Sequence, residues 1–76
     1  MKIDFKKLIE KSGKNISQRK VAKDLVTAGF YKNLDSAYAM MTYYSSGKAK
    51  GVSWDMLKWL ALYFNVNGTE LIEWDE

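Results

Sequence analysis

Cysteine, histidine and proline are all absent from this chain of 76 residues. Without cysteine there is no disulfide and no thiol chemistry, and without histidine there is neither imidazole catalysis nor a zinc site of the usual kind. The absence of these side chains leaves an apolar core to stabilise the fold.

Long apolar segments are missing as well. The longest apolar run, residues 59–64, is far shorter than the roughly 20 residues that a membrane helix needs, and the N-terminus has no long apolar stretch. The sequence therefore indicates neither membrane insertion nor secretion. It also gives no indication of a small-molecule substrate, a cofactor or a metal.

What the sequence does contain is enough for a small core. Hydrophobic residues make up 47% of the chain and aromatic residues 14%, while 28% charged residues argue against disorder. At this length a folded chain buries only about 60% of the surface that it exposes when unfolded. We therefore predict one globular domain, residues 1–76.

Positive charge is concentrated in the first half of the chain. The net charge is +3, and nine of the twelve Lys and Arg residues lie in the first 32 positions. Lys48 and Lys50 follow Gly47, whereas four of the nine acidic residues lie from Glu70 onward. The basic first half of the chain fits an anionic partner, whereas the acidic C-terminal end does not.

The apolar spacing predicts helices and no strands, because alternation of period two never persists. We expect an all-α, compact bundle of about five short helices, with Asp4, Ser17 and Ser53 as N-caps and a last helix over residues 69–74. The predicted core residues are Phe5, Leu8, Ile9, Val21, Ala22, Leu25, Ala28, Phe30, Leu34, Ala37, Met40, Met41, Tyr44, Leu57, Leu60, Ala61, Phe64, Leu71 and Ile72. We expect Trp54 to pack against the fold.

The stretch from Asp35 to Gly47 predicts a helix with one packed and one presented side. Asp35 or Ser36 can cap its start, and Gly47 can adopt the left-handed conformation that ends a helix. At about 100° per residue, one group of side chains lies opposite the predicted core positions. This outer group consists of Tyr38, Ala39, Thr42, Tyr43 and Ser46.

Three segments, taken in order and spacing, resemble a known family. They are residues 16–25 (ISQRKVAKDL), 46–48 (SGK) and 52–72 (VSWDMLKWLALYFNVNGTELI). They are similar to the second helix, the residues after the recognition helix, and the fourth helix with the start of the fifth in helix-turn-helix DNA-binding domains. The family is the phage lambda repressor and Cro type, often called Xre. The resemblance covers nearly the whole chain.

The resemblance implies a double-stranded DNA partner, a transcriptional regulator of prokaryotic or phage type, and a cytoplasmic location. The residues that it places on the DNA backbone are Ser17, Gln18, Arg19, Lys48, Lys50 and Ser53. Those that it places toward the bases are Tyr38, Ala39, Thr42 and Tyr43.

Two features depart from the family pattern. The segment from Gln18 to Gly47 is longer than in the family, so the second helix and the following turn must be longer here. The outer side of the 35–46 helix also lacks Arg, Asn, Gln and Lys, the side chains that make bidentate contacts with purines. Backbone contacts should therefore dominate any binding of DNA.

A second set of aromatic and apolar residues suits a protein partner. Trp59 and Leu62 lie on the side of their helix opposite Leu57, Leu60 and Phe64. We expect both to be exposed. Together with Tyr63 and Trp74 they form the predicted surface for a homodimer or another partner. A protein-interaction module on the same fold, with little or no DNA binding, is the alternative function.

An enzyme is not predicted. The carboxylates of Asp24, Asp35, Asp55 and Glu70 are explained as capping or surface groups. No nucleophile and base are paired at a spacing typical of catalysis.

Overall fold

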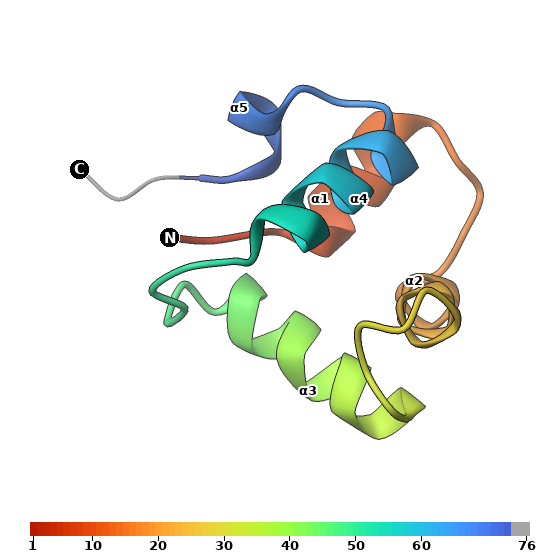
Figure 1. The fold of residues 1–76 in the computed structure, drawn as a ribbon. Coiled ribbons are helices and arrows are strands. Elements are labelled where there is room, and N and C mark those ends of the chain that lie inside the picture. Colours follow the sequence, from red (N-terminus) through yellow and green to blue (C-terminus); the bar gives the residue numbers. More distant parts are fainter. Residues whose placement is uncertain (74–76) are drawn as a thin grey trace.

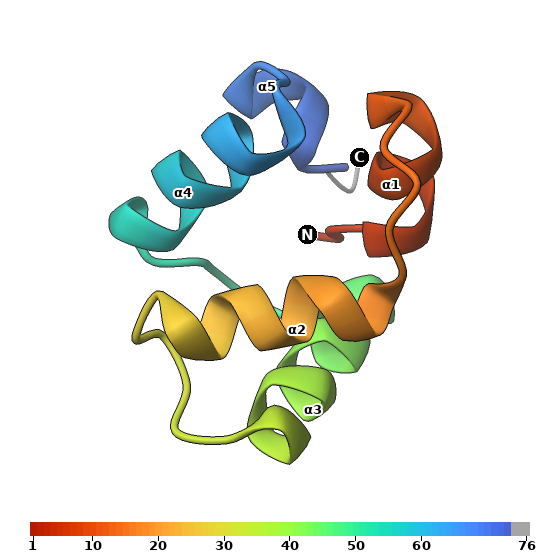
Figure 2. The same ribbon diagram turned by 90° about the vertical axis from the view of Figure 1, so that its right-hand side faces the viewer.

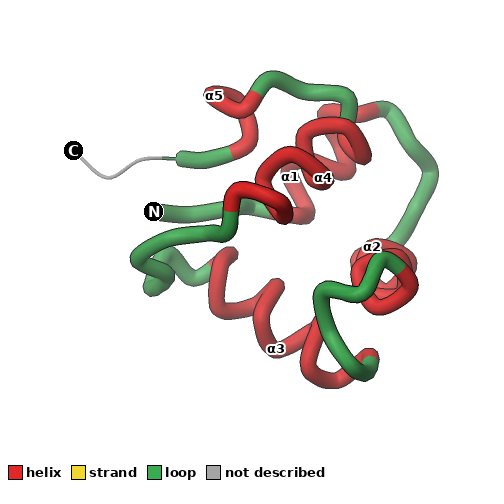
Figure 3. Tube along the Cα trace, viewed as in Figure 1, coloured by secondary structure: helices red, strands yellow, loops and turns green. Residues whose placement is uncertain are grey.

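The fold is known from a computed structural model, which describes residues 1–73 (Figure 1). Over this range the chain forms α1 (Phe5–Ser12), α2 (Gln18–Thr27), α3 (Leu34–Ser45), α4 (Trp54–Phe64) and α5 (Gly68–Leu71). Loops connect them, and no strand occurs between residues 1 and 73 (Figure 3). The prediction of a compact all-α bundle of about five helices is confirmed.

The helices form two groups. In two views at right angles, α1, α4 and α5 lie in the upper half of the molecule, and α2 and α3 lie in the lower half (Figures 1 and 2). The chain passes between the groups twice, once from α1 to α2 and once from α3 to α4. One side of α3 therefore forms part of the lower margin of the molecule.

Short polar side chains start the first four helices. The side chains of Asp4, Ser17 and Ser53 accept hydrogen bonds from the backbone N–H groups of the third residue after each, as the sequence predicts. The start of α3 differs from the prediction: Asn33, not Asp35 or Ser36, accepts from the N–H of Ser36 at 2.8 Å. An amide satisfies the same free donors as a carboxylate or a hydroxyl, and it leaves Asp35 exposed in the first turn.

One apolar core joins both groups of helices. Its fully buried members include Phe5, Leu25, Met41, Leu60 and Phe64, with the rings of Phe5 and Phe64 at 6.4 Å. Ile3, which precedes α1, is also fully buried. Every helix thus contributes to a single core, since α5 adds Leu71.

Several predicted core positions lie elsewhere. Ala28 is exposed because it is the C-cap of α2, where the chain turns away. In α4 the fully inward positions are Met56, Leu60 and Phe64, and Leu57 and Ala61 are half-buried on the flank. A small rotation of the helix, set by packing against α1 and α5, accounts for this difference. Ile9 and Met40 are half-buried as well.

The fifth helix is shorter than the predicted 69–74 span. It ends at Leu71, and Ile72 is extended with φ −110° and ψ 129°. Glu73 then pairs with Lys2 through two backbone hydrogen bonds of 2.7 and 2.8 Å. Backbone pairing with the N-terminal segment therefore replaces the last helical turn.

The connector between α2 and α3 is ordered by side chains at both ends. Phe30 and Leu34, predicted as core residues, are half-buried and pack against the core. The hydroxyl of Tyr31 contacts the Met56 sulfur at 3.8 Å, and its burial raises the pKa of Tyr31 to about 12. These contacts hold the connector against α4.

Candidate nucleic-acid interface

The candidate interface is the outer face of α3, which we define as Tyr38, Ala39, Thr42 and Tyr43. Ala37, Met41 and Tyr44 are buried on the opposite side at the spacing i, i+4, i+7, and all four outer residues are exposed. The side chains of Tyr38 and Tyr43 are 37% and 42% exposed. More than half of each residue's surface is thus covered by the rest of the chain.

The backbone of α3 is fixed at its C-terminal end. The carbonyl oxygen of Tyr44 accepts from the N–H of Ile3 at 3.0 Å, and the Ser45 hydroxyl donates to the Ile3 carbonyl at 3.1 Å. The ring of Tyr43 meets that of Tyr44 edge-on at 6.2 Å. Burial, followed by the nearby Tyr43, raises the pKa of Tyr44, whose side chain belongs to the core. The outer face of α3 is therefore presented by a helix whose C-terminal end is held against the N-terminal segment.

The loop after α3 carries two exposed lysines. Lys48 and Lys50 lie on either side of Ala49, which is only 3% exposed, so both project outward from an anchored backbone. Ser46 accepts the N–H of Lys48 at 3.4 Å. The sequence gives no sign that Ala49 is an anchor, because a single alanine between lysines produces no periodic signal.

Exposed cations also lie on α2. Gln18 and Arg19 are exposed in its first turn, while the Ser17 side chain accepts from the N–H of Lys20 at 3.1 Å. Neither Arg19, Lys48 nor Lys50 has a carboxylate partner within residues 1–73. Their charge is therefore available to an external anion.

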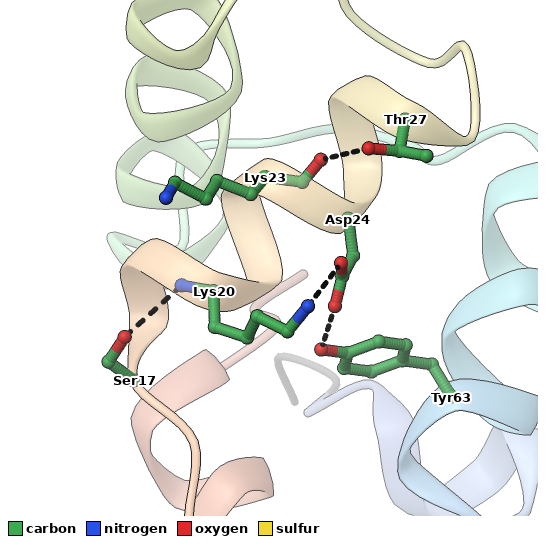
Figure 4. Close-up of polar contacts among 6 residues, drawn as sticks. All are labelled: Ser17, Lys20, Lys23, Asp24, Thr27 and Tyr63. Carbon is green, nitrogen blue, oxygen red and sulfur yellow. Dashed lines mark hydrogen bonds and ion pairs between the residues drawn. The ribbon is translucent and has the colours of Figure 1, made fainter.

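Other cations have internal partners. Lys20 pairs with Asp24 at 3.0 Å, and Lys7 pairs with Glu73 at 3.4 Å. Lys14 donates to the carbonyl oxygen of Tyr63 and lies 4.6 Å from the centre of its ring. The side chain of Lys23 extends away from Asp24 and Tyr63 (Figure 4). On α2, Lys20 is thus paired within the chain, whereas Lys23 faces solvent.

A hydrogen bond between side chains fixes α4 against α2. The hydroxyl of Tyr63 donates to Oδ2 of Asp24 at 2.6 Å, and Lys20 donates to the other carboxylate oxygen, Oδ1 (Figure 4). The bond from Tyr63, followed by interactions with Lys20, lowers the pKa of Asp24 despite its partial burial. Burial, followed by the hydrogen bond to Asp24, raises the pKa of Tyr63.

The predicted partner surface is divided by this contact. Trp59 is half-buried, and its ring stacks on Tyr63 with the centroids 4.7 Å apart. It also meets the edge of the Phe30 ring at 5.7 Å. Trp59 and Tyr63 therefore pack against residues of the same chain. Phe30, in the connector between α2 and α3, covers Trp59, and the spacing of residues in the sequence could not reveal this contact. Leu62 is exposed as predicted, and Trp74 lies outside the described residues. Trp54 is 69% exposed and does not pack as expected.

Ser53 has a defined structural role. Its side chain accepts from the N–H of Met56 at 3.2 Å and so caps α4. Its hydroxyl hydrogen can still donate to a phosphate oxygen, as can that of Ser17. These two capping serines can therefore contact phosphate in addition to the exposed Arg19, Lys48 and Lys50.

Within residues 1–73, no group of acidic side chains is arranged to hold a metal ion, and none of the helices has the length and hydropathy needed to cross a membrane. No protein-family model, curated protein or solved structure matches the chain.

Proposed function

We propose that this chain is a double-stranded DNA-binding domain of the helix-turn-helix type, with the outer face of α3 presented to the major groove. The observation that carries the proposal is the proximity in sequence of that hydroxyl-bearing face to Lys48 and Lys50, two exposed cations without a carboxylate partner in residues 1–73. A helix about 10–12 Å across fits a groove about 12 Å wide.

Phosphate contacts would come from both ends of the α2–α3 pair. Arg19 lies in the first turn of α2, and Lys48 and Lys50 follow α3. The exposed carboxylate of Asp35 disfavours phosphate near the start of α3. The proposal therefore assigns most backbone contacts to the N-terminal turn of α2 and the loop after α3.

Base contacts would be few and weakly selective. The hydroxyls of Tyr38, Thr42 and Tyr43 can exchange hydrogen bonds with bases or phosphates, and the Ala39 methyl can contact a thymine methyl. None of these side chains makes a bidentate contact with a purine. Affinity would depend mainly on charge and shape.

The α2–α3 pair resembles a helix-turn-helix with an enlarged turn. Residues 28–33 separate the two helices, whereas a turn of about three to four residues is usual in this motif. The partly buried Phe30 and the Tyr31–Met56 contact occupy the additional length. By the same resemblance, the proposal extends to a cytoplasmic transcriptional regulator of prokaryotic or phage type.

A salt series with a fluorescent random-sequence duplex tests the proposal. Replacing both Lys48 and Lys50 by Ala should weaken binding to all sequences and reduce the slope of log affinity against log salt by up to about 2, since each phosphate contact contributes about 0.9. The matched control is Lys6→Ala with Lys11→Ala, two exposed lysines of α1 without an ion pair within residues 1–73. Equal slopes for both double variants would contradict the assignment.

The alternative is a protein-interaction module, and the exposed rings of Tyr38 and Tyr43 are the observation that favours it. An aromatic interface with a protein would be far less sensitive to salt than binding to phosphates. Absence of salt-dependent binding to any duplex would reject the DNA proposal in favour of this function.

A further inference from the structure

The most apolar exposed surface of residues 1–73 lies on α4. Leu62 is 82% exposed and Trp54 is 69% exposed, more than either tyrosine on the outer face of α3. At 100° per residue, positions eight apart lie on the same side of a helix, within about 80°. Lys58 lies midway between them, and the exposed Asp55, about 100° from Trp54, lies at the edge of the same side. We define these four residues as the outer face of α4.

The outer face of α4 is symmetric about Lys58. Trp54 precedes this residue by four positions, and Leu62 follows it by four. If two copies of the helix pack antiparallel about a twofold axis at Lys58, Trp54 lies beside Leu62 of the partner subunit. Both large apolar side chains of each copy are then covered at once, as a twofold interface requires.

The charges of this face are complementary to themselves. Asp55 and Lys58 carry opposite charges, so the face has no formal net charge, although the whole chain carries +3. In the antiparallel arrangement the two Lys58 side chains start next to the axis, and each is separated from the other by extending toward Asp55 of the partner subunit, three residues away along the helix. A neutral apolar surface does not attract a nucleic acid, whereas it suits a second copy of itself.

We infer that the outer face of α4 is a self-association surface that binds a second copy of this chain in antiparallel orientation. The helix has 11 residues and is about 16 Å long. A patch of this length buries less than the roughly 1,200–2,000 Å² of a standard stable interface. The dimer is therefore weak and forms at high protein concentration. The inference does not depend on the proposed DNA binding.

Sedimentation of the whole chain over a concentration series measures the association. The parent should shift from monomer to dimer as its concentration rises, and Leu62→Glu should raise the dissociation constant at least about tenfold, because it places a carboxylate in the apolar contact. Asn15→Glu adds the same charge at another exposed position and should leave the association unchanged. Circular dichroism verifies that both variants remain folded.

Single cysteines test the orientation, since the chain has none of its own. Lys58→Cys places the two thiols next to the axis and should form a disulfide-linked dimer under mild oxidation. In Asp55→Cys the two positions are displaced by about 9 Å along the helices, beyond the roughly 7 Å that a disulfide can span. Adding Leu62→Glu to Lys58→Cys should abolish the cross-link.

Two results would overturn the inference. One is a parent that stays monomeric at the highest attainable concentration, which would leave the face to a different protein. The other is cross-linking of Asp55→Cys as fast as that of Lys58→Cys, which would exclude the antiparallel arrangement about Lys58.

Discussion

The outer faces of α3 and α4 differ in the chemistry that they offer to solvent. The face of α3 carries hydroxyl groups, two of them on the partly exposed rings of Tyr38 and Tyr43. It is followed by two lysines without a carboxylate partner in residues 1–73. The face of α4 carries an indole and an isobutyl group, with one charge of each sign between them. Association through the first should weaken with salt, whereas association through the second should change little.

The inner sides of the same two helices are alike. Ala37, Met41 and Tyr44 of α3 and Leu60 and Phe64 of α4 all belong to one core. The contrast is therefore confined to residues that folding does not require, where side chains are free to serve a partner.

The largest expected effect comes from Leu60→Ala. Leu60 is fully buried, and truncation of such a leucine costs about 2–5 kcal/mol, which approaches the roughly 5 kcal/mol stability of a small domain. Leu62→Ala, two residues later on the exposed side, should change the stability by less than about 0.5 kcal/mol. Thermal unfolding at low protein concentration measures both. Similar losses for the two variants would mean that the outer face of α4 is covered in the monomer.

Removing the Tyr63 hydroxyl should have the next largest effect. Tyr63→Phe keeps the stack on Trp59 but removes the hydrogen bond to Asp24, and a bond to a charged, partly buried group contributes about 1–2 kcal/mol. Urea unfolding at neutral pH should show this loss. Thr27→Val, which removes an exposed hydroxyl bonded within α2, is the control and should cost less.

The cost of Tyr63→Phe should depend on pH. The pKa of Asp24 is lowered in the folded chain, so its stabilising contribution is present above the ordinary value of 3.8 and is lost as the pH falls through the lowered value. The pKa of Tyr63 is raised, so its contribution is complete below the ordinary value of 10.0 and is lost as the pH rises through the raised value. The difference between parent and variant should be largest between these limits. A difference independent of pH would show that Asp24 is not the acceptor in solution.

Local signals in the sequence account for what could be predicted. Asp4, Ser17 and Ser53 cap helices because a short polar side chain before an apolar repeat satisfies free N–H groups whatever the tertiary context. The exposure of the outer face of α3 follows equally from periodicity, since Ala37, Met41 and Tyr44 define the opposite side.

The predictions for Trp59 and for the end of α5 were wrong because contacts between residues distant in sequence determine both features. Trp59 was expected in solvent, but Phe30 of the connector covers it. The last helical turn was expected to continue past Leu71, but backbone pairing of Glu73 with Lys2 is formed instead. Neither contact has a local sequence signal, and both required the arrangement of the whole chain.

The smallest predicted effect concerns the glycine at the end of α3. Gly47 has φ +83°, and no atom lies within 4 Å of the position that a β-carbon would occupy, so Gly47→Ala tests backbone strain alone. The left-handed conformation should cost about 1 kcal/mol for alanine. Gly51→Ala is the matched control, because Gly51 has equally open surroundings without a positive φ, and it should change the stability by less than about 0.5 kcal/mol. Thermal unfolding of the two variants gives the comparison. Equal stabilities would show that the loop carrying Lys48 and Lys50 relaxes freely, and the statement that its backbone is anchored would then be wrong.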